Sequence, residues 1–210
     1  TTTYFLDRLK TVNIINNPTA IRNISEKLYS YEFKKYMPPY IFTSRISDIR
    51  EFLKKNKHII IKPIHSYGGN SIKQIKNKIN KNFLINYLKK HNYIMCQKFL
   101  PGIVDGDKRV FIINGKIKGS ISRVPKKGSI LSNLSKGGTA IVSKLSKKEK
   151  FISIKVAKKL KQEGIYFAGI DFISEELNGD INVTSPTGLK NYFDLTGINL
   201  AKIFWKEIRK

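Results

Sequence analysis

The sequence predicts an α/β protein of the α+β type, built as two lobes with mainly antiparallel sheets. Short apolar segments alternate with segments whose apolar residues recur at helical spacing. Asn114–Gly115 separates two β-rich runs, which is the strongest short signal of a hairpin. Pro101–Gly102 divides the pattern into two parts, and 210 residues are enough for two small lobes.

The first part alternates helices and strands. A helix is predicted over Thr19–Lys35, because its apolar residues share one face. The elements expected after it are a strand at 40–43, a helix capped by Ser47, strands at His58–Lys62 and 71–75, a helix at 82–91 and a strand at 93–98.

The second part begins with the predicted hairpin of Lys108–Ile113 and Lys116–Arg123. Residues 124–140 are rich in Gly, Ser and Lys, which is typical of a long functional loop, and we expect a mobile lid there. The elements expected after it are a helix from the Ser146–Glu149 capping box to Gly164, strands at 165–173 and 180–184 around a turn at Asn178–Gly179, and a helix over Thr196–Arg209.

The net charge of +25 comes mostly from lysine, since only seven of the 40 basic residues are arginines. Lys, Asn and Ile are all abundant and have A/T-rich codons, and the lysines are scattered along the chain. Biased codon usage therefore explains the charge better than a nucleic-acid footprint does. The charge still attracts anions such as ATP, and Arg109 and Arg123 stand out as positions that need a planar guanidinium.

The expected location is the cytoplasm. No apolar run approaches the length of a membrane span, and residues 1–15 lack the features of a signal peptide. The single Cys96 excludes an internal disulfide and fits a reducing compartment. Because residue 1 is Thr, we expect a fragment or a processed chain.

A glycine loop is the first candidate site. Lys62 ends a predicted strand and is followed by His65–Ser71, which contains Gly68 and Gly69. Adjacent glycines let backbone N–H groups approach a phosphate, and Lys62 could reach the same phosphates. The alternative is a plain turn between two strands.

Carboxylates form the second candidate site. Asp171 lies in an apolar predicted strand, and Asp180 and Asn182 share one face of the next strand. Two carboxylates and an amide oxygen suit a hard cation that holds phosphates. The alternative is a hairpin with solvent-facing polar residues, and the pattern alone favours neither.

Two further segments carry polar groups. Arg109 follows Asp105-Gly-Asp107-Lys and points away from Val110 and Ile112, so it could brace developing negative charge, although such a cluster is more often a solvated turn. The turn Thr184–Gly188 could bind a substrate carboxylate or cap a helix. The sequence shows neither a Ser-His-Asp arrangement nor a zinc pattern.

The order of these signals closely resembles that of the bacterial glutathione synthetases, which are ATP-grasp ligases. The strings that carry the resemblance are IIKPIHSYGGNSI, QKFLPGIVDGDKRV, AGIDFI and INVTSPTG, and it extends from about Pro18 to the C-terminus. It implies an ATP-grasp fold whose two lobes enclose the nucleotide. It also implies that 1–26 is the end of a preceding domain with a connecting helix, 27–100 a small lobe and 101–210 a catalytic lobe.

The resemblance also implies roles for single residues. The ATP ligands would be Lys27, Lys62, Tyr67, Gly68, Gly69, Gln97, Lys98, Phe99, Leu100 and Asp107. Asp171, Asp180 and Asn182 would hold Mg²⁺, with Mn²⁺ as an alternative ion. Arg109 and Arg123 would be catalytic, and the peptide substrate would contact Arg109, Arg123, Asn133, Ser185, Pro186 and Thr187.

The implied reaction joins glycine to γ-glutamylcysteine through an acyl phosphate, with homo-oligomers expected for the full-length protein. The alternatives are another ATP-grasp ligase that adds glutamate or a peptide, and a nucleic-acid-binding module without catalysis. The sequence departs from the family pattern in four places: Asp180 replaces Glu, Leu131 and Thr139 replace lid arginines, and Lys190-Asn191 replaces Arg-Glu.

Overall fold

The computed structural model describes residues 2–66 and 69–209. The chain forms two compact units, one of Thr1–Tyr36 with Gly102–Lys210 and one of Met37–Pro101. The second unit thus begins at Met37 and not at residue 27. Residues 28–36 form the 3-10 segment η1 (Leu28–Tyr36), which packs against strand β9 (Glu176–Asn182) of the first unit. Within the described ranges, none of the helices has both the length and the apolar character needed to cross a membrane.

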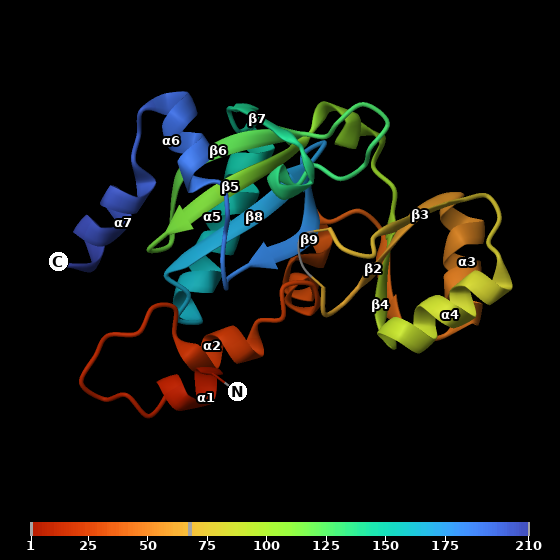
Figure 1. Cartoon of the computed structure of the whole chain (residues 1–210), viewed down its shortest axis with the longest axis horizontal. Coiled ribbons are helices and arrows are strands. Elements are labelled where there is room, and N and C mark those ends of the chain that lie inside the picture. Colours follow the sequence, from red (N-terminus) through yellow and green to blue (C-terminus); the bar gives the residue numbers. More distant parts are fainter. Residues whose placement is uncertain (1, 67–68, 210) are drawn as a thin grey trace. The chain divides into compact units, whose positions relative to one another are not determined.

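The Met37–Pro101 unit is a four-stranded antiparallel sheet with two helices on one face (Figure 1). Residues from both helices and from β2, β3 and β4 form its apolar core, among them Leu53, Ile61, Leu84 and Cys96. Because side chains alternate along a strand, Lys62 and Gln97 lie on the other face of the sheet. The elements are β1 (Tyr40–Thr43), α3 (Ile46–Asn56), β2 (His58–Pro63), β3 (Lys73–Lys76), α4 (Lys81–His91) and β4 (Ile94–Lys98), and the strand order is β1-β4-β2-β3.

The other unit contains a five-stranded antiparallel sheet covered on both faces (Figure 1). On one face Lys108 bonds to Glu149 of the long helix α5, and on the other face Phe111 packs against Tyr192 of α6. Its elements are α1 (Thr2–Leu6), α2 (Pro18–Asn23), η1, η2 (Pro101–Asp105), β5 (Asp107–Ile113), β6 (Lys116–Val124), η3 (Leu134–Lys136), β7 (Thr139–Val142), α5 (Lys147–Gln162), β8 (Phe167–Ile173), β9, α6 (Leu189–Thr196) and α7 (Leu200–Ile208), and the strand order is β7-β6-β5-β8-β9.

Two local predictions are confirmed by this sheet. The hairpin turns at Asn114 and Gly115, whose φ angles of 50° and 69° suit the two central positions of a type I′ turn. The Ser146–Glu149 capping box begins α5, because each side chain bonds to the backbone of the other residue.

Three local predictions are wrong, and a fourth is confirmed only in part. The helix expected over Thr19–Lys35 ends at Asn23, because the Glu26 carbonyl accepts a hydrogen bond of 3.0 Å from Ile181 N–H and the chain runs beside β9. The turn expected at Asn178–Gly179 lies instead at Ser174 and Glu175, and Asn178–Gly179 lies within β9 where the β8–β9 register shifts. The N-cap expected at Ser47 is wrong too, because α3 begins at Ile46 with Arg45 at its N-cap. The helix expected over Thr196–Arg209 is confirmed over Leu200–Ile208, but its start is not, because Gly197 with φ of 71° ends the unpredicted α6 and the Asn199 side chain caps α7.

Candidate functional site

Four buried charged side chains, Asp107, Arg109, Arg123 and Asp171, form a network across strands β5, β6 and β8. Arg109 lies opposite Asp171 in the β5–β8 pairing, and Asp107 lies opposite Arg123 in the β5–β6 pairing. Asp107 and Arg109 are two residues apart, so they share one face of β5. All four are at most 5% exposed. The pairing of three strands thus joins residues that are far apart in the sequence.

Each carboxylate in this network is held by forked guanidinium contacts. Arg109 donates from Nε to Asp171 Oδ1 at 2.5 Å and from Nη2 to Oδ2 at 2.8 Å. Arg123 donates from Nε to Asp107 Oδ1 at 2.7 Å and from Nη2 to Asp107 Oδ2 at 2.5 Å, and Nη2 also lies 2.8 Å from Asp171 Oδ2. Two carboxylates and two guanidiniums cancel in net charge, which makes their shared burial tolerable.

The electrostatic environments of the two carboxylates differ. Burial raises the pKa of Asp171, but the Arg109 and Arg123 guanidiniums outweigh it and bring the pKa to about 2. Burial also raises the pKa of Asp107; there Arg123 opposes the rise, and the nearby negative charge of Asp171 adds to it. Asp171 is therefore the residue whose negative charge the site stabilises most strongly.

A second cluster lies along β9. The buried Lys27 ammonium lies 3.4 Å from Asp180 Oδ1, and the Asn182 side chain accepts a 3.0 Å hydrogen bond from Ser185 N–H. Thr184 Oγ1 donates to Glu26 Oε1 at 3.4 Å. The backbone contact between Glu26 and Ile181 holds this segment against the strand. The structure thus pairs Lys27 with Asp180 and Asn182 with Ser185 along the same strand.

Glu26 is a charged member of this cluster that the sequence reasoning missed. Burial raises the pKa of Glu26, the charge of Asp180 raises it further, and Lys27 opposes the rise. The available signal was its position directly before Lys27 in a chain with only 15 carboxylate residues.

The residues predicted to hold a metal ion fit a hard cation in their chemistry. In Asp171, Oδ2 accepts two bonds and Oδ1 accepts one, so one acceptor position on Oδ1 is left. Asp180 adds a carboxylate, and Asn182 adds an amide oxygen from the neighbouring strand. In the described part of the chain no three His, Cys, Asp or Glu side chains could hold a metal ion. The oxygen set would therefore be two carboxylates and one amide.

Arg109 also links the network to the segment predicted to bind substrate. Its Nη1 donates to the Thr187 carbonyl at 3.3 Å. Gly169 makes room for this arginine, because a Cβ there would lie 2.9 Å from Arg109 Cδ and 3.1 Å from Pro186 Cβ. Asn133 stays within the 124–140 loop, where its carbonyl accepts hydrogen bonds from Lys136 N–H and Gly138 N–H.

The remaining predicted ATP ligands belong to the Met37–Pro101 unit. Lys62 and Gln97 are almost fully buried on the sheet face that carries no helix. Phe99 follows β4, where its N–H donates to the His58 carbonyl at 3.0 Å and its ring stacks on the His58 ring with 3.9 Å between centroids. The other predicted ligands in this unit are Lys98, Leu100 and Gly69, whose φ is 72°. Tyr67 and Gly68 lie outside the described residues.

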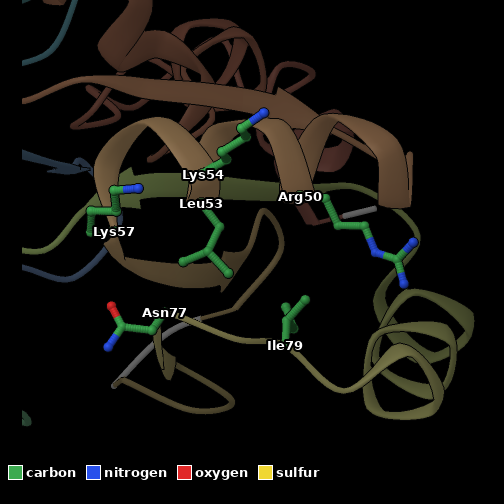
Figure 2. Close-up of a pocket in the computed structure, with 6 residues that line it drawn as sticks. All are labelled: Arg50, Leu53, Lys54, Lys57, Asn77 and Ile79. Carbon is green, nitrogen blue, oxygen red and sulfur yellow. The ribbon is translucent and has the colours of Figure 1, made fainter.

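A cavity of about 320 Å³ in the same unit is separate from these residues. Figure 2 shows its lining, which is Arg50, Leu53, Lys54, Lys57, Asn77 and Ile79. None of them is a predicted site residue. Lys54 and Lys57 lie at the C-terminal end of α3, where cations complement the helix dipole, so a structural role accounts for them.

Most of the chain is similar to proteins of one known family. A family model described as "Prokaryotic glutathione synthetase, ATP-grasp domain" matches residues 26–197. A glutathione synthetase of Prochlorococcus marinus is 38% identical over 195 residues, with 91% of this chain and 63% of the relative covered. That of Bradyrhizobium diazoefficiens is 33% identical over 217 residues, with 100% and 68% covered. That of Buchnera aphidicola subsp. Baizongia pistaciae is 39% identical over 202 residues, with 94% and 62% covered.

Solved structures show the same fold at lower identity. The ATP-grasp ligase PsnB, complexed with a precursor variant, Mg and ADP, has a TM-score of 0.70 at 16% identity, with 97% of this chain and 64% of that chain covered. D-alanine–D-alanine ligase from Bacillus anthracis, complexed with ATP, has a TM-score of 0.67 at 18% identity, with 96% and 70% covered. The predicted ATP-grasp fold and the predicted resemblance are both confirmed. The chain, which spans between 62% and 68% of the three relatives named above, belongs to the prokaryotic glutathione synthetase family through its ATP-grasp domain.

Proposed function

We propose that this protein joins glycine to γ-glutamylcysteine at the expense of ATP, giving glutathione, ADP and phosphate. The observation that carries the proposal is the buried Asp107–Arg123–Asp171–Arg109 network, which contacts the Thr187 segment within the region matched by the family model. A buried and fully paired set of charges suits a reaction in which negative charge develops on a transferring phosphoryl group.

The nucleotide would be bound by residues from both sequence regions. Lys27 and Lys62 would contact the ATP phosphates, with Gly69, Gly68 and Tyr67 beside them. Gln97, Lys98, Phe99 and Leu100 would line the adenine site. The contact of Lys27 with Asp180, a proposed cation ligand, supports this role, and so does the place of Lys62 near the end of β2, before the glycine loop.

Asp171, Asp180 and Asn182 would hold Mg²⁺, or Mn²⁺ in its place. When bound, the cation would neutralise phosphate charge during transfer to the cysteinyl carboxylate. The position left on Asp171 Oδ1 and the amide oxygen of Asn182 support this assignment.

Arg109 and Arg123 would act near the peptide substrate. Arg109 would orient the Ser185–Thr187 segment, to which it is already bonded, and Asn133 would approach the substrate from the loop 124–140. That loop would exclude water, which otherwise hydrolyses an acyl phosphate before the glycine amine attacks it.

The expected setting is the cytoplasm, with γ-glutamylcysteine, glycine and ATP as small-molecule partners and a homo-oligomer as the assembled state. The buried Cys96 thiol agrees with a protein that needs no disulfide.

Release of ADP in the presence of Mg²⁺ tests the proposal. γ-Glutamylcysteine and glycine together should stimulate release strongly, and either substrate alone should not. Glutamate-containing and peptide acceptors are tested in parallel, and stimulation by these alone would instead support another ATP-grasp ligase. Asn182→Ala should abolish the stimulation, whereas Lys158→Ala, on the exposed side of α5, should retain it.

A further inference from the structure

The Asp107 carboxylate is held by contacts within the chain, whereas the family resemblance implies that it contacts ATP. As an ATP ligand Asp107 would offer its carboxylate to the nucleotide. In the structure it is only 3% exposed, and both of its oxygens accept hydrogen bonds from Arg123, at 2.7 Å and 2.5 Å. A nucleotide hydroxyl could reach this carboxylate only by displacing a forked guanidinium pair, which is among the stronger contacts available to an aspartate.

Arg123 passes this contact on to Asp171. One nitrogen, Nη2, lies 2.5 Å from Asp107 Oδ2 and 2.8 Å from Asp171 Oδ2. The guanidinium is planar and rigid, so holding its Nε and Nη2 on Asp107 also fixes the direction in which Nη2 meets Asp171. Without Asp107, the arginine could rotate toward Asp171 or away from it.

Asp171 is therefore oriented from two strands at once. Arg109 on β5 contacts both of its oxygens, and Arg123 on β6 contacts Oδ2 alone. This asymmetry satisfies Oδ2 and leaves one acceptor position on Oδ1. The two oxygens of a carboxylate are chemically equivalent, so the Arg123 contact is what makes their positions unequal: the position next to Arg123 is fully bonded, and the other stays open.

We propose that Asp107 is a positioning residue, which holds Arg123 so that Asp171 keeps one oxygen directed to a divalent cation. The inference rests on the proposed function, because it assigns Asp171 to the cation that accompanies ATP. It replaces the implied role of Asp107 as an ATP ligand. Partners that orient a metal ligand commonly change metal affinity by about 10–100-fold when they are altered.

Two variants separate positioning from nucleotide binding. Asp107→Asn keeps the shape and one acceptor oxygen but loses the charge and the second acceptor. The exchange Asp107→Arg with Arg123→Asp keeps an opposed pair in the same strand register but moves the guanidinium from β6 to β5. Asp194→Asn, on the exposed surface of α6, is the matched control.

Calorimetry measures the affinity for ATP under two conditions. A chelator gives the metal-free affinity, and added Mg²⁺ gives the Mg²⁺-dependent affinity. For Asp107→Asn the metal-free affinity should stay within about twofold of the unaltered chain, and the Mg²⁺-dependent affinity should fall about 10-fold or more. The exchange variant should regain the unfolding midpoint lost by Asp107→Asn without regaining the Mg²⁺-dependent affinity. Loss of metal-free affinity in Asp107→Asn would restore the ATP-ligand role, and recovery of the Mg²⁺-dependent affinity by the exchange would show that the pair is structural only.

A measurement without nucleotide tests the contacts of the network separately from the proposed function. Hydrogen exchange of the Arg109 and Arg123 Nε–H groups, followed by NMR, should accelerate at both arginines in Asp107→Asn. The substitution weakens the hold on Arg123, and Arg123 shares Asp171 with Arg109. Acceleration at Arg123 alone would contradict the link through Asp171. A chain that passes these tests but forms no glutathione contradicts the proposed function and leaves the positioning role standing.

Discussion

Asp171 lies between two guanidiniums in a strand whose side chains are buried on both faces. The sequence could predict that this carboxylate was unusual, because an aspartate in the apolar string AGIDFI needs a partner. It could not identify the partners, because Arg109 and Arg123 meet Asp171 only through the register of β5 with β8 and β6. A shift of one residue would place each side chain on the opposite face.

Removing the charge of Asp171 should destabilise the fold strongly. Asp171→Asn leaves Arg109 and Arg123 sharing one buried carboxylate, and breaking such a buried set lowers the free energy of unfolding by about 3–5 kcal/mol. Urea unfolding measures the change. Asp194→Asn, which breaks an exposed pair with Lys190, should change it by less than about 1 kcal/mol. Equal effects of the two substitutions would show that the buried network adds nothing to stability.

The Cys96 thiol should be protected from ionisation in the folded chain. Burial raises the pKa of Cys96 from 9.0 to about 12, with a smaller contribution from the charge of Asp48. The unfolded thiol loses its proton at lower pH than the folded one, so this group's contribution to stability is full below pH 9.0 and is lost as the pH rises toward 12. Alkylation at neutral pH should be slow in the native chain and fast in denaturant, and fast labelling of the native chain would contradict the burial.

At the scale of elements, Asn16 joins the start of the chain to two strands. Its side-chain nitrogen donates to the carbonyls of Phe167 and Val183, and its side-chain oxygen accepts from Tyr166 N–H and Phe167 N–H, all at 2.7 Å. Nothing in the sequence marks Asn16 among many exposed asparagines, because its partners lie about 150 residues away in the chain. The N-terminal segment is thereby anchored before Lys27 meets β9.

Asn16→Ala should lower the free energy of unfolding by about 1–3 kcal/mol or more, since it leaves buried strand-end groups without partners. Thermal or urea unfolding would report the loss. The neighbouring exposed Asn13→Ala is the control and should stay within about 0.5 kcal/mol of the unaltered chain. If Asn16→Ala also changed the free energy of unfolding by less than about 0.5 kcal/mol, water would have to replace its four hydrogen bonds at no cost in stability.

Local turn signals predicted one hairpin correctly and another incorrectly. Asn114–Gly115 lies between two strands that pair directly, so the local preference and the sheet agree. Asn178–Gly179 has the same dipeptide, but Ser174 and Glu175 make the turn and Gly179, with φ of 79°, lies within β9. An Asn-Gly pair therefore marks a backbone that can adopt positive φ, and the packing of Leu177 and Ile181 decides where the strand reverses.

For the whole molecule, the family and fold could be predicted from four strings, because each combines an element with a chemical group. The chain forms two compact units, and one of them ends at Pro101. The charge of +25 would attract the anionic substrates proposed above, ATP and γ-glutamylcysteine. The network of Asp107, Arg123, Asp171 and Arg109 contains two negative and two positive side chains. The net positive charge of the protein therefore comes from residues outside the network.

The acyl-phosphate route of the proposed ligase is tested most directly by a heavy-oxygen label. γ-Glutamylcysteine labelled in its cysteinyl carboxylate is supplied with ATP, Mg²⁺ and glycine, and the phosphate and glutathione are examined by mass spectrometry. The account predicts that each glutathione formed transfers one labelled oxygen to phosphate, and that Asp171→Asn prevents the transfer. Glutathione formed with unlabelled phosphate, or ATP hydrolysed without any glutathione, would contradict it.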